Sequence, residues 1–329
     1  MKSKTEPSAD LQNGLKNGLV VAGFGRHVMV ETDAGERVIC HPRGKKNTAV
    51  VGDRIKWLTT QDEGTIEKLV PRKNLFYRQD EIRTKSFAAN LDQILILIAA
   101  EPEFSESQLS RALIAAEAEH ITPIIALNKS DLKVPFAKAW ERLQPYQEMG
   151  YQVVSLSLKP KNSNRGSDDS DFDIEQIAQQ TELLMSLLQD KTTLVLGPSG
   201  AGKSTLINAV VPNVSVFTQE ISQALNSGKH TTTSTTWYWV DEAKTTSIID
   251  SPGFQEFGLN HIEASHLASY MPDFKIHVPN CKFYNCSHLH EPGCGVLESI
   301  KNDSSQRKIS LERYRIYSSL FAELSETRY

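Results

Sequence analysis

The sequence predicts a multidomain protein with an all-β barrel near its N-terminus, a central α/β domain, and a C-terminal domain built round cysteines and a helix. Between residues 18 and 70, short β-type runs alternate with turn residues, and from residue 90 apolar strands alternate with helical periodicity. Three of the four cysteines fall within residues 281–294. We therefore expect a disordered tail over 1–15, a barrel over 16–85, an α/β domain over 86–260 and a metal-binding domain over 261–329.

The N-terminal barrel is expected to have five strands and an OB-like fold, a fold whose faces bind oligonucleotides. Its candidate core positions have β spacing and comprise Val28, Val30, Val38, Cys40, Val50, Val51, Ile55, Trp57 and Ile66. Cys40 is expected to be a buried thiol. Although the whole chain has a net charge of −4, residues 16–90 hold 14 Lys/Arg against 9 Asp/Glu. The barrel is therefore the favoured contact for a polyanion. Residues 41–46 (HPRGKK) fit either a phosphate contact or a solvated loop.

The central domain begins with a βαβ unit of a parallel sheet. Residues 94–100 (ILILIAA) and 123–127 (PIIAL) are nearly continuous apolar runs, as strands covered on both faces require, and 107–120 has helical periodicity. A helix over 136–149, a strand over 152–155 and a helix over 174–188 follow. The low-complexity stretch 159–171 is expected to be a flexible surface insertion.

Residues 197–204 (GPSGAGKS) match the complete G-x-x-x-x-G-K-[ST] pattern of a phosphate-binding P-loop, between a predicted strand over 192–196 and a predicted helix over 204–211. Glycines let successive backbone N–H groups turn toward one anion. Lys203 is expected to reach the β- and γ-phosphates, and Ser204 to ligate Mg²⁺. The expected phosphate-binding residues are Gly197, Pro198, Ser199, Gly200, Ala201, Gly202, Lys203, Ser204 and Thr205.

Residues 128–131 (NKSD) follow the predicted strand 123–127, where a ligand crevice belongs at the carboxyl end of a parallel sheet. The Asp131 carboxylate is able to accept hydrogen bonds from N1–H and the exocyclic amine of guanine, whereas adenine offers no matching pair of donors. Asn128 is expected either to contact the base edge or to brace the loop, and Lys129 to lay its stem over the ring. Ser155 is a candidate support for the base. Asp131 therefore favours a guanine nucleotide and disfavours a P-loop kinase or ATPase.

Residues 250–253 (DSPG) follow a predicted apolar strand over 246–249. In P-loop GTPases the equivalent Asp acts on Mg²⁺ through water and the Gly N–H senses the γ-phosphate, which assigns those roles to Asp250 and Gly253. Switch I is expected within residues 226–233 (NSGKHTTT), with one of Thr231, Thr232 or Thr233 closing on Mg²⁺; Thr232 is our choice.

Phe254 stands just after this motif, where Ras-like proteins place the glutamine that orients the attacking water. A phenyl ring cannot orient water, so slow intrinsic hydrolysis is expected. His230 is our candidate catalytic group beside Lys203.

The cysteine cluster has the pattern C-x4-C-x-H-x5-C, with Cys281, Cys286, His288 and Cys294 as candidate ligands of one structural Zn²⁺. His290 competes with His288 for the fourth position. Beyond it, a stripe at helical spacing is expected to be a packing face: Tyr314, Tyr317, Phe321 and Leu324. The basic residues around it are candidate RNA contacts: Arg307, Lys308, Arg313 and Arg315.

No apolar run approaches the length of a membrane span, and the first residues lack the apolar core of a secretory signal. We expect a cytoplasmic monomer without membrane contact.

The motif order is circularly permuted, because the base motif at 128–131 precedes the P-loop. With GPSGAGKS, GKHTTT, DSPGF and the cysteine–histidine cluster, the chain resembles the ribosome small-subunit-dependent GTPase family of the RsgA/YjeQ type. The resemblance covers nearly the whole chain. Family members usually read GQSGVGKS and DTPGF, so Pro198, Ala201 and Ser251 depart slightly, and none of the three removes a phosphate or Mg²⁺ ligand.

The resemblance implies an OB barrel, a permuted GTPase domain and a zinc domain, with His288 favoured over His290. It implies action in late maturation of the small (30S) ribosomal subunit, GTP hydrolysis stimulated by that subunit, and rRNA binding by the barrel and zinc domains. The alternative is a nucleotide-gated RNA-binding module whose hydrolysis is incidental.

Overall fold

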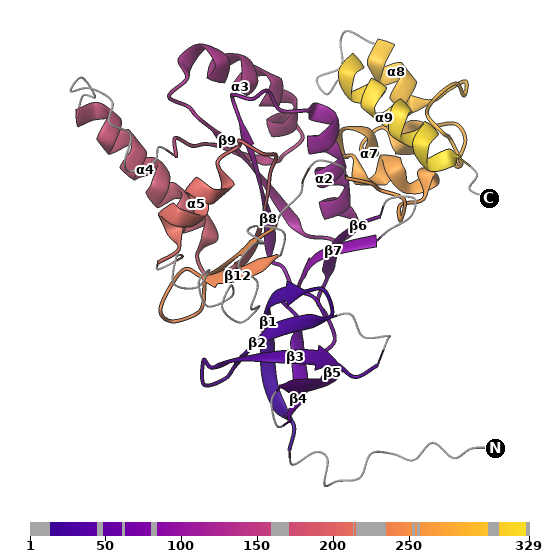
Figure 1. Ribbon diagram of the computed structural model, residues 1–329. Helices are drawn as coiled ribbons and strands as arrows, with labels where there is room; N and C mark the ends of the chain where they lie inside the picture. Colours follow the sequence, from indigo (N-terminus) through magenta and orange to yellow (C-terminus); the bar gives the residue numbers. More distant parts are fainter. Residues whose placement is uncertain are drawn as a thin grey trace, which may run out of the picture.

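The computed structural model contains the three expected parts, which Figure 1 shows as a barrel, a helix-covered sheet and a group of C-terminal helices. The described residues are 14–44, 49–60, 63–79, 84–158, 171–212, 214, 235–251, 254, 257–301 and 309–326, with backbone only for 171–178. Nearly all of the predicted tail and of the predicted insertion 159–171 lies outside these residues.

Five strands form the barrel: β1 (Lys16–Phe24), β2 (His27–Thr32), β3 (Arg37–Pro42), β4 (Arg54–Thr59) and β5 (Gly64–Leu69). They pair in the order β1-β2-β3-β5-β4, and β4 pairs with β1 to close the barrel. The core includes Trp57 and Cys40, and burial raises the pKa of the Cys40 thiol to about 12. Gly64 lies so close to this core that a Cβ would stand 2.4 Å from the Cys40 sulfur. The predicted five-stranded barrel and buried thiol are confirmed.

The central sheet carries the expected parallel strands in the order β10-β9-β8-β11-β13, with β12 antiparallel at the end. Its strands are β8 (Gln93–Ala99), β9 (Thr122–Asn128), β10 (Gln152–Ser155), β11 (Thr192–Leu196), β12 (Thr236–Trp239) and β13 (Ser247–Asp250). Its helices are α2 (Glu106–Ala118), α3 (Lys133–Glu148), α4 (Asp171–Leu188) and α5 (Lys203–Val210). Every residue of β8 is buried, as a strand covered on both faces requires.

Strand β12 was not predicted, and it joins the barrel to the central sheet. Ala22 of β1 pairs with Thr236, so one eleven-stranded sheet runs through both parts. Beside this junction the buried carboxylate of Glu31 accepts hydrogen bonds from Trp239 Nε1 at 2.9 Å and Lys244 Nζ at 2.6 Å. The barrel is therefore held against the α/β domain by a shared ladder and a buried polar cluster.

A hairpin of β6 (Leu75–Gln79) and β7 (Thr84–Ala89) lies across the predicted boundary at residue 85. Its edge meets the chain that follows β13, because Gln79 N donates to Gly258 O at 3.1 Å and Asn260 N donates to Gln79 O at 3.0 Å.

The C-terminal part comprises η1 (Ala264–Tyr270), α7 (Pro272–Lys275), η2 (Val278–Asn280), α8 (Gly295–Lys301) and α9 (Leu311–Ser325). Figure 1 places these helices beside α2. Tyr317 of α9 is buried and stacks on Phe274 with ring centroids 4.5 Å apart. The predicted aromatic stripe is therefore a packing face. Within the described residues, no helix combines the length and apolar character needed to cross a membrane.

Arg313 is not an RNA contact, contrary to the expectation from the sequence. Its side chain is buried, donates to the two Asp273 carboxylate oxygens at 2.9 Å each and to Ser110 Oγ at 2.7 Å. The physical reason is helical spacing: Arg313 lies four residues before Tyr317 and so shares the buried face of α9. Arg315 is exposed, and Arg307 and Lys308 lie outside the described residues.

Arg313→Ala should destabilise the C-terminal part by about 3–5 kcal/mol, because it leaves the Asp273 carboxylate, only 11% exposed, without its partner. Arg315→Ala is the matched control on the same helix; its pair with Glu312 is exposed and contributes at most about 1 kcal/mol. Amide hydrogen exchange along α9 should be much faster in the first variant and nearly unchanged in the second. Equal protection in both would contradict the assigned role.

Candidate nucleotide site and metal centre

The candidate phosphate loop connects β11 to α5 at the carboxyl end of the central sheet. Two of its glycines are required sterically. A Cβ on Gly197 would lie 2.2 Å from Leu97 O, and a Cβ on Gly202 would lie 2.4 Å from Asn128 Nδ2. Gly202 also has φ of +103°, a conformation that favours glycine. The loop therefore packs so closely against β8 and β9 that no side chain larger than hydrogen fits at Gly197 or Gly202.

Lys203 lies folded into this loop, where its ammonium group donates to Gly197 O at 2.7 Å. Burial lowers the pKa of Lys203, and the nearby Asp250 carboxylate opposes the shift. Burial in turn raises the pKa of Asp250, opposed by Lys203. The P-loop and the DSPG motif, more than 40 residues apart in sequence, are thus brought together by the pairing of β11 with β13.

A magnesium ion fits the donor groups beside Lys203. Among the described residues, Asp250 Oδ1 is buried and has no hydrogen-bond partner, as expected of an oxygen that holds a cation through water. Ser204 is exposed at the start of α5, and Thr205 follows it in the same turn. Pro198 and Ala201 close the loop by an Ala201 N to Pro198 O hydrogen bond of 3.3 Å, and Ser199 and Gly200 form its exposed crest.

Asn128 braces two loops of the site. It is only 1% exposed; its Nδ2 donates to Ala201 O at 2.9 Å and its Oδ1 accepts from Leu158 N at 3.0 Å. Of the two roles that the sequence left open for Asn128, the described contacts show bracing. The P-loop and the loop after β10 are therefore fixed relative to each other by one amide side chain.

The candidate base-recognition residues follow Asn128 directly. Lys129 has φ of +68° and donates from Nζ to Glu101 O. The exposed Asp131 accepts a hydrogen bond from Ser157 Oγ at 3.2 Å. Ser155 lies within β10, paired with Leu127, so the hydroxyl that orients Asp131 belongs to Ser157.

The sequence pattern favours Ser155 as the support for the base, whereas in the structure Ser157 contacts Asp131. The signal that points to it is position: ligand-binding groups of a parallel sheet lie beyond the carboxyl end of a strand, and Ser157 is two residues past the end of β10.

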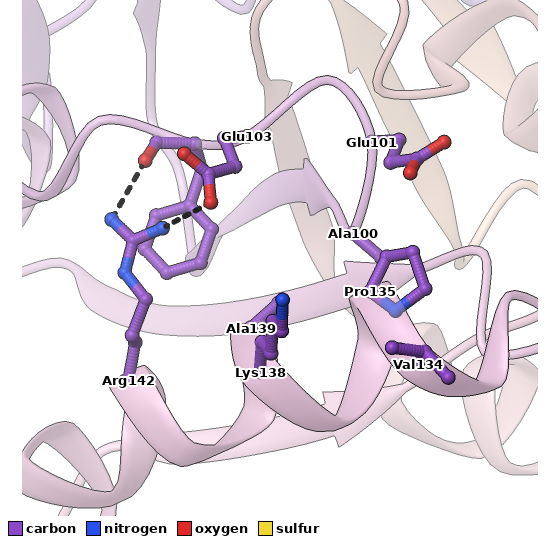
Figure 2. Close-up of a pocket in the computed structure, with 9 residues that line it drawn as sticks. Ala100, Glu101, Glu103, Val134, Pro135, Lys138, Ala139 and Arg142 are labelled. Atoms are coloured by element: carbon purple, nitrogen blue, oxygen red, sulfur yellow. Dashed lines mark hydrogen bonds and ion pairs between the residues drawn. The ribbon is translucent and has the colours of Figure 1, made fainter.

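A third loop, over residues 100–104, flanks the P-loop. A Cβ on Gly200 would lie 3.3 Å from the Pro102 side chain, so the two loops are in close contact. Arg142 of α3 holds the third loop by donating a hydrogen bond to Phe104 O at 3.0 Å. The Arg142 guanidinium carbon lies 4.3 Å from the centroid of the Phe104 ring. Figure 2 shows Glu103 facing the same guanidinium, and its Oε1 is 3.9 Å from Arg142 Nη1. A pocket of about 160 Å³ remains between the loop and α3.

Several candidate residues lie outside the described part of the chain: His230, Thr231, Thr232, Thr233 and Gly253. Phe254 is described and is buried at 3% exposure, 6.4 Å from the ring of Phe257. Phe257 also stacks on Phe87. The Phe254 ring therefore belongs to a buried apolar cluster and offers no polar group that could orient a water molecule.

The cysteine–histidine cluster is assembled with the geometry of a metal centre. The donor atoms of Cys281, Cys286, His288 and Cys294 all lie within 4.8 Å of one another. His288 Nδ1 is 3.5 Å from each of the Cys281 and Cys294 sulfurs, which are 4.0 Å apart. A tetrahedral Zn²⁺ with Zn–S of about 2.3 Å and Zn–N of about 2.0 Å requires edges of about 3.5–3.8 Å. The four groups could therefore hold a zinc ion, and His290 is exposed.

Surrounding groups orient these donors. Glu291 accepts from Ser287 N at 2.8 Å and Ser287 Oγ at 2.6 Å. Burial raises the pKa of the Glu291 carboxyl, but these hydrogen bonds outweigh it and leave the pKa well below its usual value. Burial lowers the pKa of His288, which favours the neutral, ligating imidazole. From α9, Tyr317 Oη donates to Ser287 O at 2.9 Å.

Comparison with known proteins agrees with this arrangement. Residues 69–260 match the family model of the RsgA GTPase. A small ribosomal subunit biogenesis GTPase RsgA of Variovorax paradoxus is 66% identical over 96% of this chain and 94% of that relative. One of Paraburkholderia phytofirmans is 45% identical over 94% and 93%.

Two solved structures share the fold. YjeQ from Thermotoga maritima superposes with a TM-score of 0.68 at 28% identity, covering 95% of this chain and all of that one. YloQ, a circularly permuted GTPase, gives 0.63 at 26% identity, covering 96% and 97%. The resemblance stated from the motifs is confirmed, and the chain belongs to the RsgA GTPase family.

Proposed function

We propose that this protein hydrolyses GTP to GDP and phosphate in late maturation of the small ribosomal subunit, and that the subunit stimulates its hydrolysis. The observation that carries the enzymatic part is the joining of P-loop, NKSD loop and DSPG strand into one site by Asn128 and by the β11–β13 pairing. The partner is supported by two relatives at 66% and 45% identity, which are both named as small ribosomal subunit biogenesis GTPases.

The nucleotide occupies the crest of the P-loop in this proposal. Asp131, oriented by Ser157, accepts the two guanine donors, and the Lys129 stem covers the ring. Ser204 and Thr232 would hold Mg²⁺ directly and Asp250 would hold it through water. The ion would supply positive charge against the β- and γ-phosphates. Lys203 exchanges its contact with Gly197 O for the phosphates. Asn128 fixes the distance between the base-binding and phosphate-binding loops.

The barrel and the C-terminal domain bind rRNA in this proposal. Cys281, Cys286, His288 and Cys294 would hold one structural Zn²⁺, which would stabilise the C-terminal loop and supply nothing to hydrolysis. The protein acts in the cytoplasm as a monomer. The rival function, a nucleotide-gated RNA-binding module, differs in its turnover: its hydrolysis would not respond to small ribosomal subunits.

Asp131→Asn should weaken GTP and GDP binding by at least tenfold, because hydrogen bonds to a charged group contribute about 1.5–3 kcal/mol each. Xanthine nucleotides should bind better than in the wild type, since an amide is able to donate to the xanthine carbonyl. Isothermal calorimetry measures both, with Asp33→Asn on an exposed barrel turn as control. Equal affinity of the wild type for ATP and GTP would show the base assignment to be wrong.

Freshly purified reduced protein should contain one zinc per chain, and Cys286→Ser should lose it while still binding GTP, because the nucleotide site lies on a different part of the fold. Cys40→Ala, which removes a buried thiol of the barrel, should retain the metal. Elemental analysis measures the zinc content per chain of the wild type and of the two variants. An absence of stoichiometric metal from the wild type would refute a zinc site.

His230→Ala should leave GTP affinity nearly unchanged and remove most of the subunit-stimulated hydrolysis, since Phe254 is buried in an apolar cluster and leaves the attacking water without its usual polar partner. Water orientation acts on the transition state, so kcat falls more than binding. Stimulated turnover is titrated against small subunits. Full recovery of kcat at saturating subunit would instead assign His230 to subunit binding.

A further inference from the structure

The C-terminal domain carries an aromatic, basic loop between two of its metal ligands. Residues 282–285 (KFYN) lie between Cys281 and Cys286, and all four are exposed. Tyr284 is 102% exposed and Phe283 41% exposed, whereas Phe274 and Tyr317 of the same domain are buried and Tyr270, Tyr314 and Phe321 are partly buried. Tyr284 therefore contributes nothing to the packing of the domain.

Both ends of this loop are fixed. Cys281 and Cys286 belong to the four-residue cluster whose donor atoms lie within 4.8 Å of one another. Lys282 N donates to Gly293 O at 2.9 Å, and Cys281 N donates to Val278 O at 3.1 Å. Gly293 has φ of +70°, and a Cβ there would lie 3.2 Å from the Lys282 side chain. The exposed rings stand on a short loop with little backbone freedom, so a ligand that contacts them orders few residues on binding.

The charge around the loop favours an anionic partner. Residues 274–290 contain two lysines and no aspartate or glutamate. The flanking acids are engaged elsewhere, because Asp273 pairs with Arg313 and Glu291 accepts hydrogen bonds from Ser287. Lys282 Nζ lies 5.6 Å from the centroid of the Phe283 ring, so cation and ring are presented together. An exposed aromatic surface with adjacent cations suits a single-stranded nucleic acid, in which bases stack on rings and phosphates pair with lysines.

We propose that this loop binds an unpaired segment of RNA, with one base stacked on Tyr284 and the adjacent phosphate held by Lys282. The proposal rests on the proposed function, in which the partner is a ribosomal subunit. It adds the residues that contact the RNA and specifies that the bound RNA is single-stranded. A ribosomal protein is the other chemical class able to cover an exposed tyrosine, but the exposed Lys282 beside the two rings favours RNA.

The test uses the full-length zinc-loaded protein and two probes: a fluorescein-labelled mixed-sequence RNA 12-mer, single-stranded or annealed to its complement, and small ribosomal subunits. Tyr284→Ala should weaken binding of the single strand and of the subunit by roughly tenfold, while Tyr284→Phe and Tyr284→Trp should retain it, because a stacked base requires only a ring. Lys282→Ala should reduce the slope of log affinity against log salt by about 0.7 on the single strand.

Leu311→Ala is the matched control, because Leu311 is also a large exposed apolar residue of this domain, at 63% exposure, but has no ring. It should leave both affinities unchanged. Basal GTP turnover and zinc content should be normal in every variant.

Normal binding of the single strand by Tyr284→Ala overturns the proposal. Weakened subunit binding with normal single-strand binding also overturns it and assigns the loop to a ribosomal protein. If subunits fail to stimulate hydrolysis by the wild type, the proposed function fails, and the RNA titrations still decide the role of Tyr284 independently.

Discussion

The nucleotide site depends on one buried amide. Asn128 joins the loop that carries Lys203 to the loop that carries Ser157, and no room remains between them: any side chain on Gly202 would collide with the Asn128 amide. Buried amides are costly unless their donors and acceptors are satisfied, and both ends of this one are. The same residue ends β9 and begins the base-recognition loop. A rearrangement of either loop therefore breaks a buried hydrogen bond, which keeps the base and phosphate subsites at a fixed separation.

The permuted order of motifs changes where the segment after the DSPG motif leads. Phe254 and Phe257 enter an apolar cluster with Phe76 and Phe87 of the β6–β7 hairpin. On the other side, Arg111 of α2 donates to Phe257 O at 3.2 Å and pairs with Glu323 of α9. The end of this segment is thus anchored to the hairpin that follows the barrel and to the C-terminal helix. The junction at Ala22 and Thr236 adds a second connection, because β12 follows directly on the region assigned to switch I. Both stretches that the sequence assigns to the switches therefore lead into elements that contact the neighbouring domains.

The C-terminal part relies on a metal-ligand cluster and on the ion pair between Arg313 and Asp273. The helical segments η1, α7, η2 and α8 are short, with seven residues or fewer each, and bury little apolar surface by themselves. Tyr314 and Tyr317 connect α9 to the metal loop through backbone carbonyls, and Arg313 connects α9 to α7 and α2. The long helix α9 thereby connects the metal loop, α7 and α2.

The sequence alone determined the parts of this protein whose signals are local. The P-loop, the NKSD and DSPG motifs and the cysteine spacing each occupy fewer than fifteen residues, and the strands that carry them are continuous apolar runs, so both the strands and the positions of the site residues at their ends were predictable. The tertiary structure decided the features that depend on distant partners. Strand β12 finds its edge at β1 more than 200 residues away, and the partner of Arg313 on α2 is equally remote. An arginine on an amphipathic helix can be buried only if the facing element supplies a carboxylate, and Asp273 is that partner for Arg313. Similarly, Ser157 becomes a site residue only because β10 lies beside β9. Periodicity specifies which residues share a face, but only packing specifies what that face meets.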